Sequence, residues 1–431
     1  MPPPIRMQAM GDELGEQAGA ASSRSSEVVP SGIFYGWIIV WAAFVILTIF
    51  SGITYSTPVL FRFFEAEFAI GRGQAAFIFS LSQLITFVVA PVAGSLAEKH
   101  GPRLVVGGGL AVLALGLLGA ARSTSYGQLL GCYGVMVGIG SGAIYVPLLG
   151  VIQRWFYRHR GRASGLATTG GGIGTLTFPI IAGAAAGTFG WRWLYVGFAT
   201  VCISIGVLAM SVLVADPSKR GLHPDGDLHP AAQPGAGATS GMSLRETFRD
   251  AQFYQLYFCS FGAAVMSFMA LVHLPQQVAE ASGERMYPAS IVSVIGLASL
   301  AARFGGGSWA DRVGRIAMIR VALALMLITS ILWVANPWGL NLYFVVAALF
   351  GLTYGLSIAL LPAVIADSFG NKEISRIIGT IYTAFALAGL LGPTVAGVLR
   401  DRFGNYNLAL TICIVLCAAT LVASAGLRKR F

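Results

Sequence analysis

The sequence predicts an all-α membrane protein whose twelve transmembrane helices form two similar halves. Three observations carry this prediction. First, 56% of the 431 residues are hydrophobic and only 11% are charged, with a mean hydropathy of +0.74, whereas a soluble domain carries about 25% charged residues. Second, apolar runs of about twenty residues, long enough to cross a bilayer, recur along the chain. Third, the two halves repeat several residues at matching positions.

Each apolar run is assigned one transmembrane helix. The predicted spans are 33–60, 73–97, 104–121, 127–153, 162–188, 193–214, 251–280, 287–310, 316–335, 340–366, 374–399 and 406–427. Residues 1–31 are expected to be a disordered cytoplasmic tail, because they are polar and lack the basic and apolar regions of a signal peptide. The remaining predicted divisions are an N-terminal six-helix bundle (32–214), a cytoplasmic linker rich in Pro, Gly and charge (215–250), a C-terminal six-helix bundle (251–427) and a basic cytoplasmic tail (428–431).

The net charge of +10 reflects topology. If the N-terminal tail is cytoplasmic, twenty of the 28 Lys and Arg residues lie on the cytoplasmic side, seven lie in outer loops, and Arg303 is left inside the membrane. This is the positive-inside distribution. We therefore expect a multi-pass protein of the cell (inner) membrane with both termini cytoplasmic, whose partners are the lipid bilayer and a small molecule and not nucleic acid.

Cysteine usage and the acidic residues indicate neither a cofactor nor a catalytic centre. The five cysteines all fall in apolar spans without metal-ligand spacing, and small buried side chains explain them. No midplane acid, metal spacing or nucleophile with a base is apparent, so we expect no metal, no cofactor and no enzymatic activity.

The third observation is the internal repeat. "GSLAEKHGPR" (94–103) matches "GSWADRVGR" (307–315), and in the fifth and eleventh spans a Gly, a Pro and a second Gly recur, separated along the chain by nearly the same number of residues as the two loop segments (Gly165, Pro179 and Gly183; Gly379, Pro393 and Gly397). A duplicated six-helix unit in a membrane is typical of transporters, which bind substrate near the midplane between the halves.

The repeated loop segment resembles the motif G-x-x-x-D-R-x-G-R of the major facilitator superfamily. The second copy is complete, and the first copy has Glu for Asp, Lys for Arg and an inserted Pro102. We expect the charged residues of both copies to form a cytoplasmic charge lattice that takes part in gating (Glu98, Lys99, Arg103, Asp311, Arg312 and Arg315). The resemblance implies the major facilitator fold, with two bundles and one site alternately open to each side.

A second resemblance narrows the family. "RWFYRHRGRASGLATTGGGIG" (154–174) is similar to the monocarboxylate transporter family, including its oxalate:formate antiporter branch, and "FYGWIIV" (34–40) resembles the start of that family's first helix. The glycines of "GGGIG" could suggest a dinucleotide-binding loop. They follow no predicted strand and lie inside a span, so close helix packing explains them better.

Arg303 lies eight residues, about 12 Å, from Asp311 at the cytoplasmic end of its span. An arginine near a helix centre costs about 2.5–3.5 kcal/mol or more on insertion into a membrane. None of the eighteen acidic residues lies in the middle of a predicted span, so we expect the missing counter-ion to be a substrate carboxylate held by the guanidinium fork. A structural role remains open, through backbone carbonyls freed by the glycines 305–307 or through Asp311. The family resemblance also implies a substrate-binding arginine in this eighth helix.

Further polar residues are placed to line the same site. His273 is the sole histidine in a span, on the seventh helix, and is either a packed hydrogen-bonding group or a substrate contact and proton carrier. Tyr145 and Tyr354 lie too deep for an interfacial belt, although core packing is an alternative for both. The resemblance implies an aspartate where this chain has Ser299. A serine can donate a hydrogen bond but cannot carry a proton. The predicted substrate-binding residues are Arg303, His273, Tyr145, Tyr354, Ser299, Tyr382, Tyr55 and Thr169, and the predicted proton-coupling residues are His273 and Arg303.

The charge of the site favours a small monocarboxylate. All four lysines lie in loops or the tail, so the eleventh span lacks the second cation that the resemblance implies for oxalate antiporters. The leading hypothesis is a transporter of lactate- or pyruvate-like acids, coupled to protons. The alternatives are a carboxylate exchanger of the oxalate/formate kind, another major facilitator carrier, and a transporter-like sensor, which normally needs a signalling domain.

Overall fold

The computed structural model describes residues 34–156, 159–226, 241–282, 287–335, 339–370 and 372–430, and within these ranges it does not describe the side chains at 98, 160–161, 306–308, 311 and 374–375. The predicted tail of residues 1–31, residues 227–240 of the linker and the side chains of Glu98 and Asp311 therefore lie outside the described part. Within that part, twelve helical segments are long and apolar enough to cross a membrane. The predicted fold class is confirmed.

The helices before the linker are α2 (Tyr35–Phe68), α3 (Arg72–His100), α4 (Pro102–Ala121), the broken fourth span, α8 (Arg160–Thr188) and α9 (Trp191–Val212). The fourth span consists of α5 (Tyr126–Leu129), the π-helix η1 (Leu130–Val137), α6 (Gly138–Gly142) and α7 (Tyr145–Trp155). The described linker contains two short 3-10 turns, η2 (Pro217–Arg220) and η3 (Pro224–Gly226), and one short helix, α10 (Leu244–Thr247). The helices after it are α11 (Ala251–Ser282), α12 (Tyr287–Val313), α13 (Arg315–Ala335), α14 (Leu340–Phe369), α15 (Ile374–Phe403) and α16 (Asn407–Ser424).

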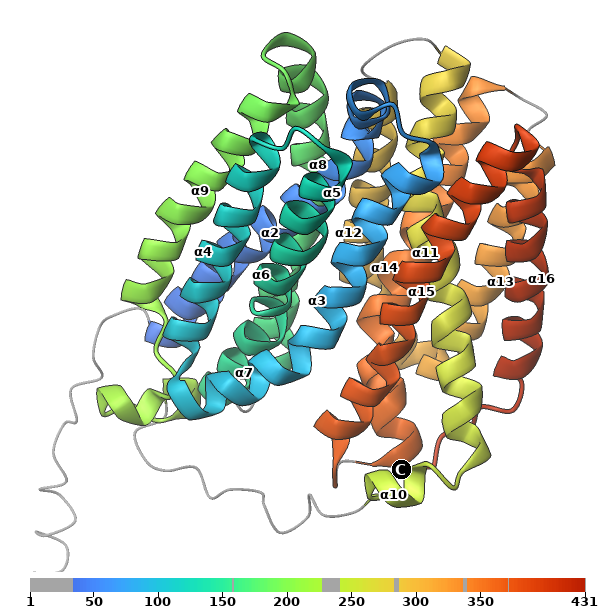
Figure 1. The fold of residues 1–431 in the computed structure, drawn as a ribbon. Helices are drawn as coiled ribbons and strands as arrows, with labels where there is room; N and C mark the ends of the chain where they lie inside the picture. Colours follow the sequence, from blue (N-terminus) through green and yellow to red (C-terminus); the bar gives the residue numbers. More distant parts are fainter. Residues whose placement is uncertain are drawn as a thin grey trace, which may run out of the picture. The chain divides into compact units, whose positions relative to one another are not determined.

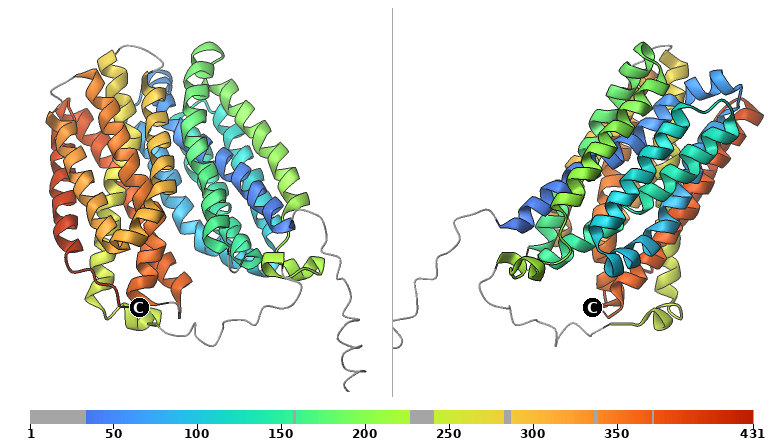
Figure 2. Two further views of the ribbon diagram at one scale, coloured as in Figure 1. Left: turned by 180° about the vertical axis from the view of Figure 1, so that it is seen from behind. Right: turned by 60° about the vertical axis from the view of Figure 1, so that its left-hand side comes forward.

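Helices α2–α9 form an N-terminal bundle and α11–α16 a C-terminal bundle, and two helix pairs make extensive contacts between them. Helix α3 packs against α15 on one side, and α8 packs against α12 on the other (Figure 1). The view from behind shows the second pair (Figure 2). We call the end where α9 stops and α11 starts the linker end. The opposite end, where α3 begins at Arg72 and α15 ends at Phe403, is the far end.

Helix α2 continues to Phe68, beyond the predicted end of the first span at residue 60. The apolar period is kept by Phe61 and Phe64, which are buried, and Phe64 meets the Trp191 ring at 5.0 Å. Glu67, one turn further along the helix, accepts a 2.7 Å hydrogen bond from Nε1 of the same Trp191 side chain. The first helix is therefore longer than the predicted span, because partners on α9 allow the charged residues after position 60 to remain helical.

The glycine-rich stretch of α8 lets that helix touch the backbone of α2. A Cβ at Gly170 would lie 2.2 Å from the carbonyl oxygen of Phe44, and one at Gly174 would lie 2.0 Å from that of Thr48. Side chains at these positions would force the helices apart. Close packing of small residues, a common basis of helix association in membranes, thus accounts for the "GGGIG" stretch.

We expect Gly174→Ala to lower the thermal stability of the protein in detergent, because overpacking a tight contact costs about 1–3 kcal/mol. Gly165→Ala is the matched control in the same helix, since a Cβ there would meet nothing within 4 Å. The unfolding midpoint, followed by size-exclusion chromatography after heating, should fall for the first variant and stay unchanged for the second. Equal midpoints for both variants would contradict the α2–α8 contact.

Candidate functional site

Arg303 lies on α12 at the boundary between the bundles. Its Nη1 donates a hydrogen bond of 3.1 Å to the carbonyl oxygen of Thr168 on α8. The same nitrogen lies 3.8 Å from the place where Gly171 would carry a Cβ, so α8 places no side chain against the guanidinium at that position. Its Nε is buried without a hydrogen-bond partner among the described residues. The described acidic side chains likewise form no ion pair with Arg303; that of Asp311 is not described.

The structure brings four tyrosines to this arginine. The hydroxyls of Tyr55 on α2, Tyr145 on α7, Tyr354 on α14 and Tyr382 on α15 each interact electrostatically with the guanidinium. Two of these helices belong to each bundle, so the group spans the boundary. We call Arg303 and these four residues the central cluster.

Depth divides the central cluster into two levels. Arg303, Tyr145 and Tyr382 lie ten, ten and eight residues from the linker-end termini of their helices. Tyr55 and Tyr354 lie nearer the far end, and their hydroxyls share a hydrogen bond of 2.8 Å that joins α2 to α14. The tyrosine pair therefore connects the bundles on the far-end side of the guanidinium.

A break in the fourth span positions Tyr145. The predicted single helix over 127–153 is interrupted by the π-helix Leu130–Val137 and by a turn at Ala143–Ile144, and α7 begins at Tyr145 itself. A π-turn re-aims the side chains that follow it, and such turns are frequent at functional sites. Hydropathy could not show this break, because the whole stretch is apolar.

Ser299 and Thr169, also predicted to bind substrate, differ in their surroundings. Ser299 lies one helical turn from Arg303, is only 2% exposed, and its Oγ makes no hydrogen bond within the described part. The Thr169 hydroxyl donates instead to the Gly165 carbonyl of its own helix at 2.9 Å. The neighbouring Thr168 carbonyl, which the sequence did not single out, contacts the arginine.

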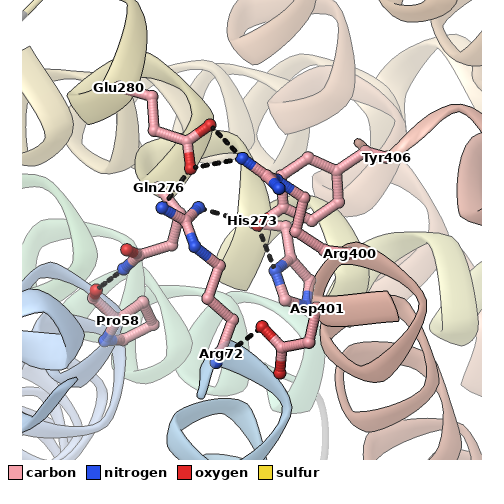
Figure 3. Close-up of polar contacts among 8 residues, drawn as sticks. All are labelled: Pro58, Arg72, His273, Gln276, Glu280, Arg400, Asp401 and Tyr406. Atoms are coloured by element: carbon pink, nitrogen blue, oxygen red, sulfur yellow. Dashed lines mark hydrogen bonds and ion pairs between the residues drawn. The ribbon is translucent and has the colours of Figure 1, made fainter. Parts of the chain in front are cut away.

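His273 does not join the central cluster. Its Nε2 lies 2.8 Å from the carbonyl oxygen of Pro393. Its Nδ1 lies 3.1 Å from the Tyr406 hydroxyl (Figure 3). It is nine residues from the far end of α11, whereas Arg303 is sixteen residues from the far end of α12, a difference in depth of about 10 Å. The expected convergence with Arg303 was wrong, because adjacent helices can place residues at different depths.

The loop-motif residues make contacts within their own bundles. Arg103 donates through Nη2 to the Ser211 carbonyl near the end of α9, at 3.4 Å, and Arg315 pairs with Asp367 of α14 at 3.0 Å. Lys99 and Arg312 are exposed. The lattice through Glu98 and Asp311 involves side chains outside the described part, so it stays a prediction.

Comparison with known proteins decides the family. The model described as Major Facilitator Superfamily matches residues 39–393 and 256–430. The chain belongs to the major facilitator superfamily. This major facilitator protein is therefore a transporter and not an enzyme.

The relatives of this major facilitator protein include monocarboxylate transporters, in agreement with the resemblance of residues 154–174, and also an efflux protein. It is 27% identical to Monocarboxylate transporter 13 of Bos taurus, covering 91% of this chain and 88% of that one. It is 24% identical to the Fujikurins efflux protein of Gibberella fujikuroi, covering 96% and 86%. A bacterial homolog of the human lysosomal transporter Spinster, solved in an inward-facing and unoccupied conformation, shares the fold with a TM-score of 0.71 and 15% identity over 92% of this chain and 98% of that chain.

Proposed function

We propose that this protein carries small monocarboxylates of the lactate and pyruvate kind across the membrane by alternating access, with Arg303 binding the carboxylate. One observation carries the proposal: a guanidinium inside the bundle whose Nη1 meets only a backbone carbonyl and whose Nε is buried without a partner among the described residues. A guanidinium presents five donors in a fixed fork that matches a carboxylate. Substrate would supply the counter-charge that the described acids do not.

The geometry supports a specific sequence of events. A carboxylate reaching Arg303 would lie beside Tyr145 and Tyr382, at the same depth, and beneath the Tyr55–Tyr354 pair that joins the bundles. Neutralising the arginine lowers the cost of enclosing it away from water. Loading would then favour closure on the linker side, after which the tyrosine pair must separate to release substrate at the far end.

Charge matching supports one carboxylate and not two. Arg303 is the cation of the central cluster, and the lysines of the described part, Lys99, Lys219, Lys372 and Lys429, lie outside the spans. The similarity to a protein named Monocarboxylate transporter 13 points the same way. The positive-inside distribution supports a cytoplasmic linker end.

Carboxylate exchange without net proton movement is the second candidate. Both nitrogens of His273 have partners away from the site, and Ser299 stands where the family resemblance implies a carboxyl group. Of the predicted proton-coupling residues this leaves Arg303, which stays protonated in proteins, so the proton would have to travel with the substrate. The Fujikurins efflux protein among the relatives makes export a second direction of transport to assay.

Uptake of labelled lactate into proteoliposomes separates these candidates. Proton-coupled transport predicts accumulation when the outside is acidified relative to the lumen, and collapse of that accumulation when an ionophore dissipates the gradient. Exchange predicts uptake only into vesicles preloaded with unlabelled carboxylate, with no response to the pH gradient. Transport of neither lactate nor pyruvate under both conditions would reject the proposed substrate class.

A further inference from the structure

The far end of the molecule contains a second polar group that neither the central cluster nor the proposed transport of carboxylates uses. It joins the start of α3, in the N-terminal bundle, to the ends of α11 and α15 and to Tyr406, in the C-terminal bundle (Figure 3). We call Arg72, Glu280, Arg400, Asp401 and Tyr406 the far-end clamp. It contains two positive and two negative side chains, and Glu65 of α2 interacts electrostatically with three of them, Arg72, Asp401 and Glu280.

Asp401 caps a helix that belongs to the other bundle. Its Oδ1 accepts from the backbone N–H of Arg72 at 3.0 Å, and its Oδ2 accepts from that of Gly73 at 2.8 Å. These are first-turn donors of α3 without partners in their own helix, and the positive end of the helix dipole also favours a carboxylate. A Cβ at Gly71 would lie 2.6 Å from Oδ2, so glycine at that position admits the carboxylate.

Arg72 adds an ion pair across the same boundary. Its guanidinium pairs with Glu280 of α11, and its Nη1 donates to the Tyr406 hydroxyl at 3.2 Å. Glu280 also accepts from Arg400 Nη2, at 3.3 Å to each oxygen. Glu280 thus lies between an arginine of the opposite bundle and an arginine of its own.

His273 orients this contact through Tyr406. The Pro393 carbonyl can only accept, so His273 Nε2 donates to it, and in the neutral imidazole Nδ1 then accepts from the Tyr406 hydroxyl. The Tyr406 oxygen is left to accept from Arg72. His273 is therefore a positioning residue for the clamp.

When the far end opens, the contacts of the clamp separate into two groups. The cap from Asp401 to α3 and the contacts of Arg72 with Glu280 and Tyr406 cross between bundles and must break. The contacts from Glu280 to Arg400 and from His273 to Tyr406 lie within the C-terminal bundle and can persist. Glu280 would therefore keep a counter-ion throughout, so the opening step leaves no unpaired carboxylate at that position.

We propose that Asp401 is the latch of the far-end gate, and that its release from the N-terminus of α3 limits how often the far end opens. The proposal rests on the transporter fold and the clamp geometry, and holds whichever substrate Arg303 binds.

A cysteine at Ser80 provides a reporter of opening. Ser80 is fully buried and lies seven residues from both Gly73 and Phe87, hence on the same face of α3. Both neighbours meet the C-terminal bundle, Gly73 through Asp401 and Phe87 through the ring of Phe385 at 5.8 Å. Opening of the far end should expose this position to a soluble maleimide.

The experiment measures maleimide labelling of purified full-length Ser80→Cys protein in detergent, where both ends are accessible. Adding Asp401→Asn, which removes the charge and one accepting oxygen, should raise the labelling rate about two- to fivefold, the usual effect of removing a negative charge from a helix N-terminus. Glu280→Gln should also raise the labelling rate, because the ion pair with Arg72 is lost. The parent without the reporter measures the background from the five native cysteines.

Glu67→Gln is the matched control, because Glu67 pairs with Arg192 and accepts from Trp191 at the same end but within one bundle. Its labelling rate should equal that of the reporter parent. The proposal is overturned if Asp401→Asn and Glu280→Gln, eluting as monodisperse protein, label no faster than the parent, or if Glu67→Gln labels as fast as they do. Should Asp401→Asn not fold, the Glu280→Gln rate decides between these outcomes.

Discussion

Arg303→Gln is expected to abolish lactate transport, with a loss of at least about 100-fold in the initial rate at subsaturating substrate. Truncating one partner of a buried charged pair costs about 2–5 kcal/mol or more, and a factor of 100 corresponds to about 2.8 kcal/mol. Glutamine retains an amide donor, but it is shorter than arginine and has no charge to neutralise the substrate. The measurement is initial-rate uptake into proteoliposomes containing equal amounts of protein.

Two further variants separate the role of charge from that of shape. Arg303→Lys should retain part of the transport with a raised KM, because an ammonium keeps the charge but loses the two-point fork. Arg376→Gln is the control for the loss of one positive charge, since Arg376 is 73% exposed on α15 and pairs only weakly with Glu373. Undiminished lactate transport by Arg303→Gln would remove Arg303 as the carboxylate site.

Ser299→Asp is expected to lower apparent substrate affinity at least about tenfold. Residues four apart lie on one face of a helix, so the introduced carboxylate would pair with Arg303 and occupy the counter-ion position that we assign to substrate. A tenfold loss of substrate affinity requires the introduced carboxylate to stabilise the substrate-free arginine by only about 1.4 kcal/mol. The concentration dependence of uptake at pH 8 measures it.

Two controls test whether the charge at position 299 causes the loss: an uncharged variant, and a lower pH that protonates the introduced aspartate. The asparagine of Ser299→Asn is nearly the same size as the aspartate of Ser299→Asp but has no charge. This variant should therefore change the apparent substrate affinity much less. Lowering the pH should partly restore transport by Ser299→Asp, because protonation of the carboxyl group releases Arg303. Similar losses in the Asp and Asn variants, with no response to pH, would show that position 299 affects transport through packing and not through charge.

The sequence indicated which tyrosines lie deep in the membrane, but not that they contact one another or Arg303. Tyr145 and Tyr354 were singled out because a phenol buried that far in a span is unusual, and both interact with Arg303 in the structure. The hydrogen bond between Tyr55 and Tyr354 joins residues 299 positions apart in the chain. Helix rotation in each bundle determines such a contact, and no local pattern records it.

His273 shows the converse limitation. Its position on the seventh span, next to the eighth in the chain, suggested convergence with Arg303. One residue step turns a helix by about 100° and raises it by 1.5 Å, so neighbouring helices bring together only residues that match in both depth and face. His273 matches Tyr406 and Pro393 instead.

The sequence by itself determined the twelve spans, the two related halves and the presence of one cation deep in an apolar helix. These properties follow from transfer free energies that act residue by residue, and composition along the chain records them directly. Only the tertiary structure decided that α8 approaches α2 through Gly170 and Gly174, that the fourth span breaks before Tyr145, and that Asp401 caps a helix of the opposite bundle. Those outcomes depend on how all the helices pack at once, which no single segment of the chain specifies.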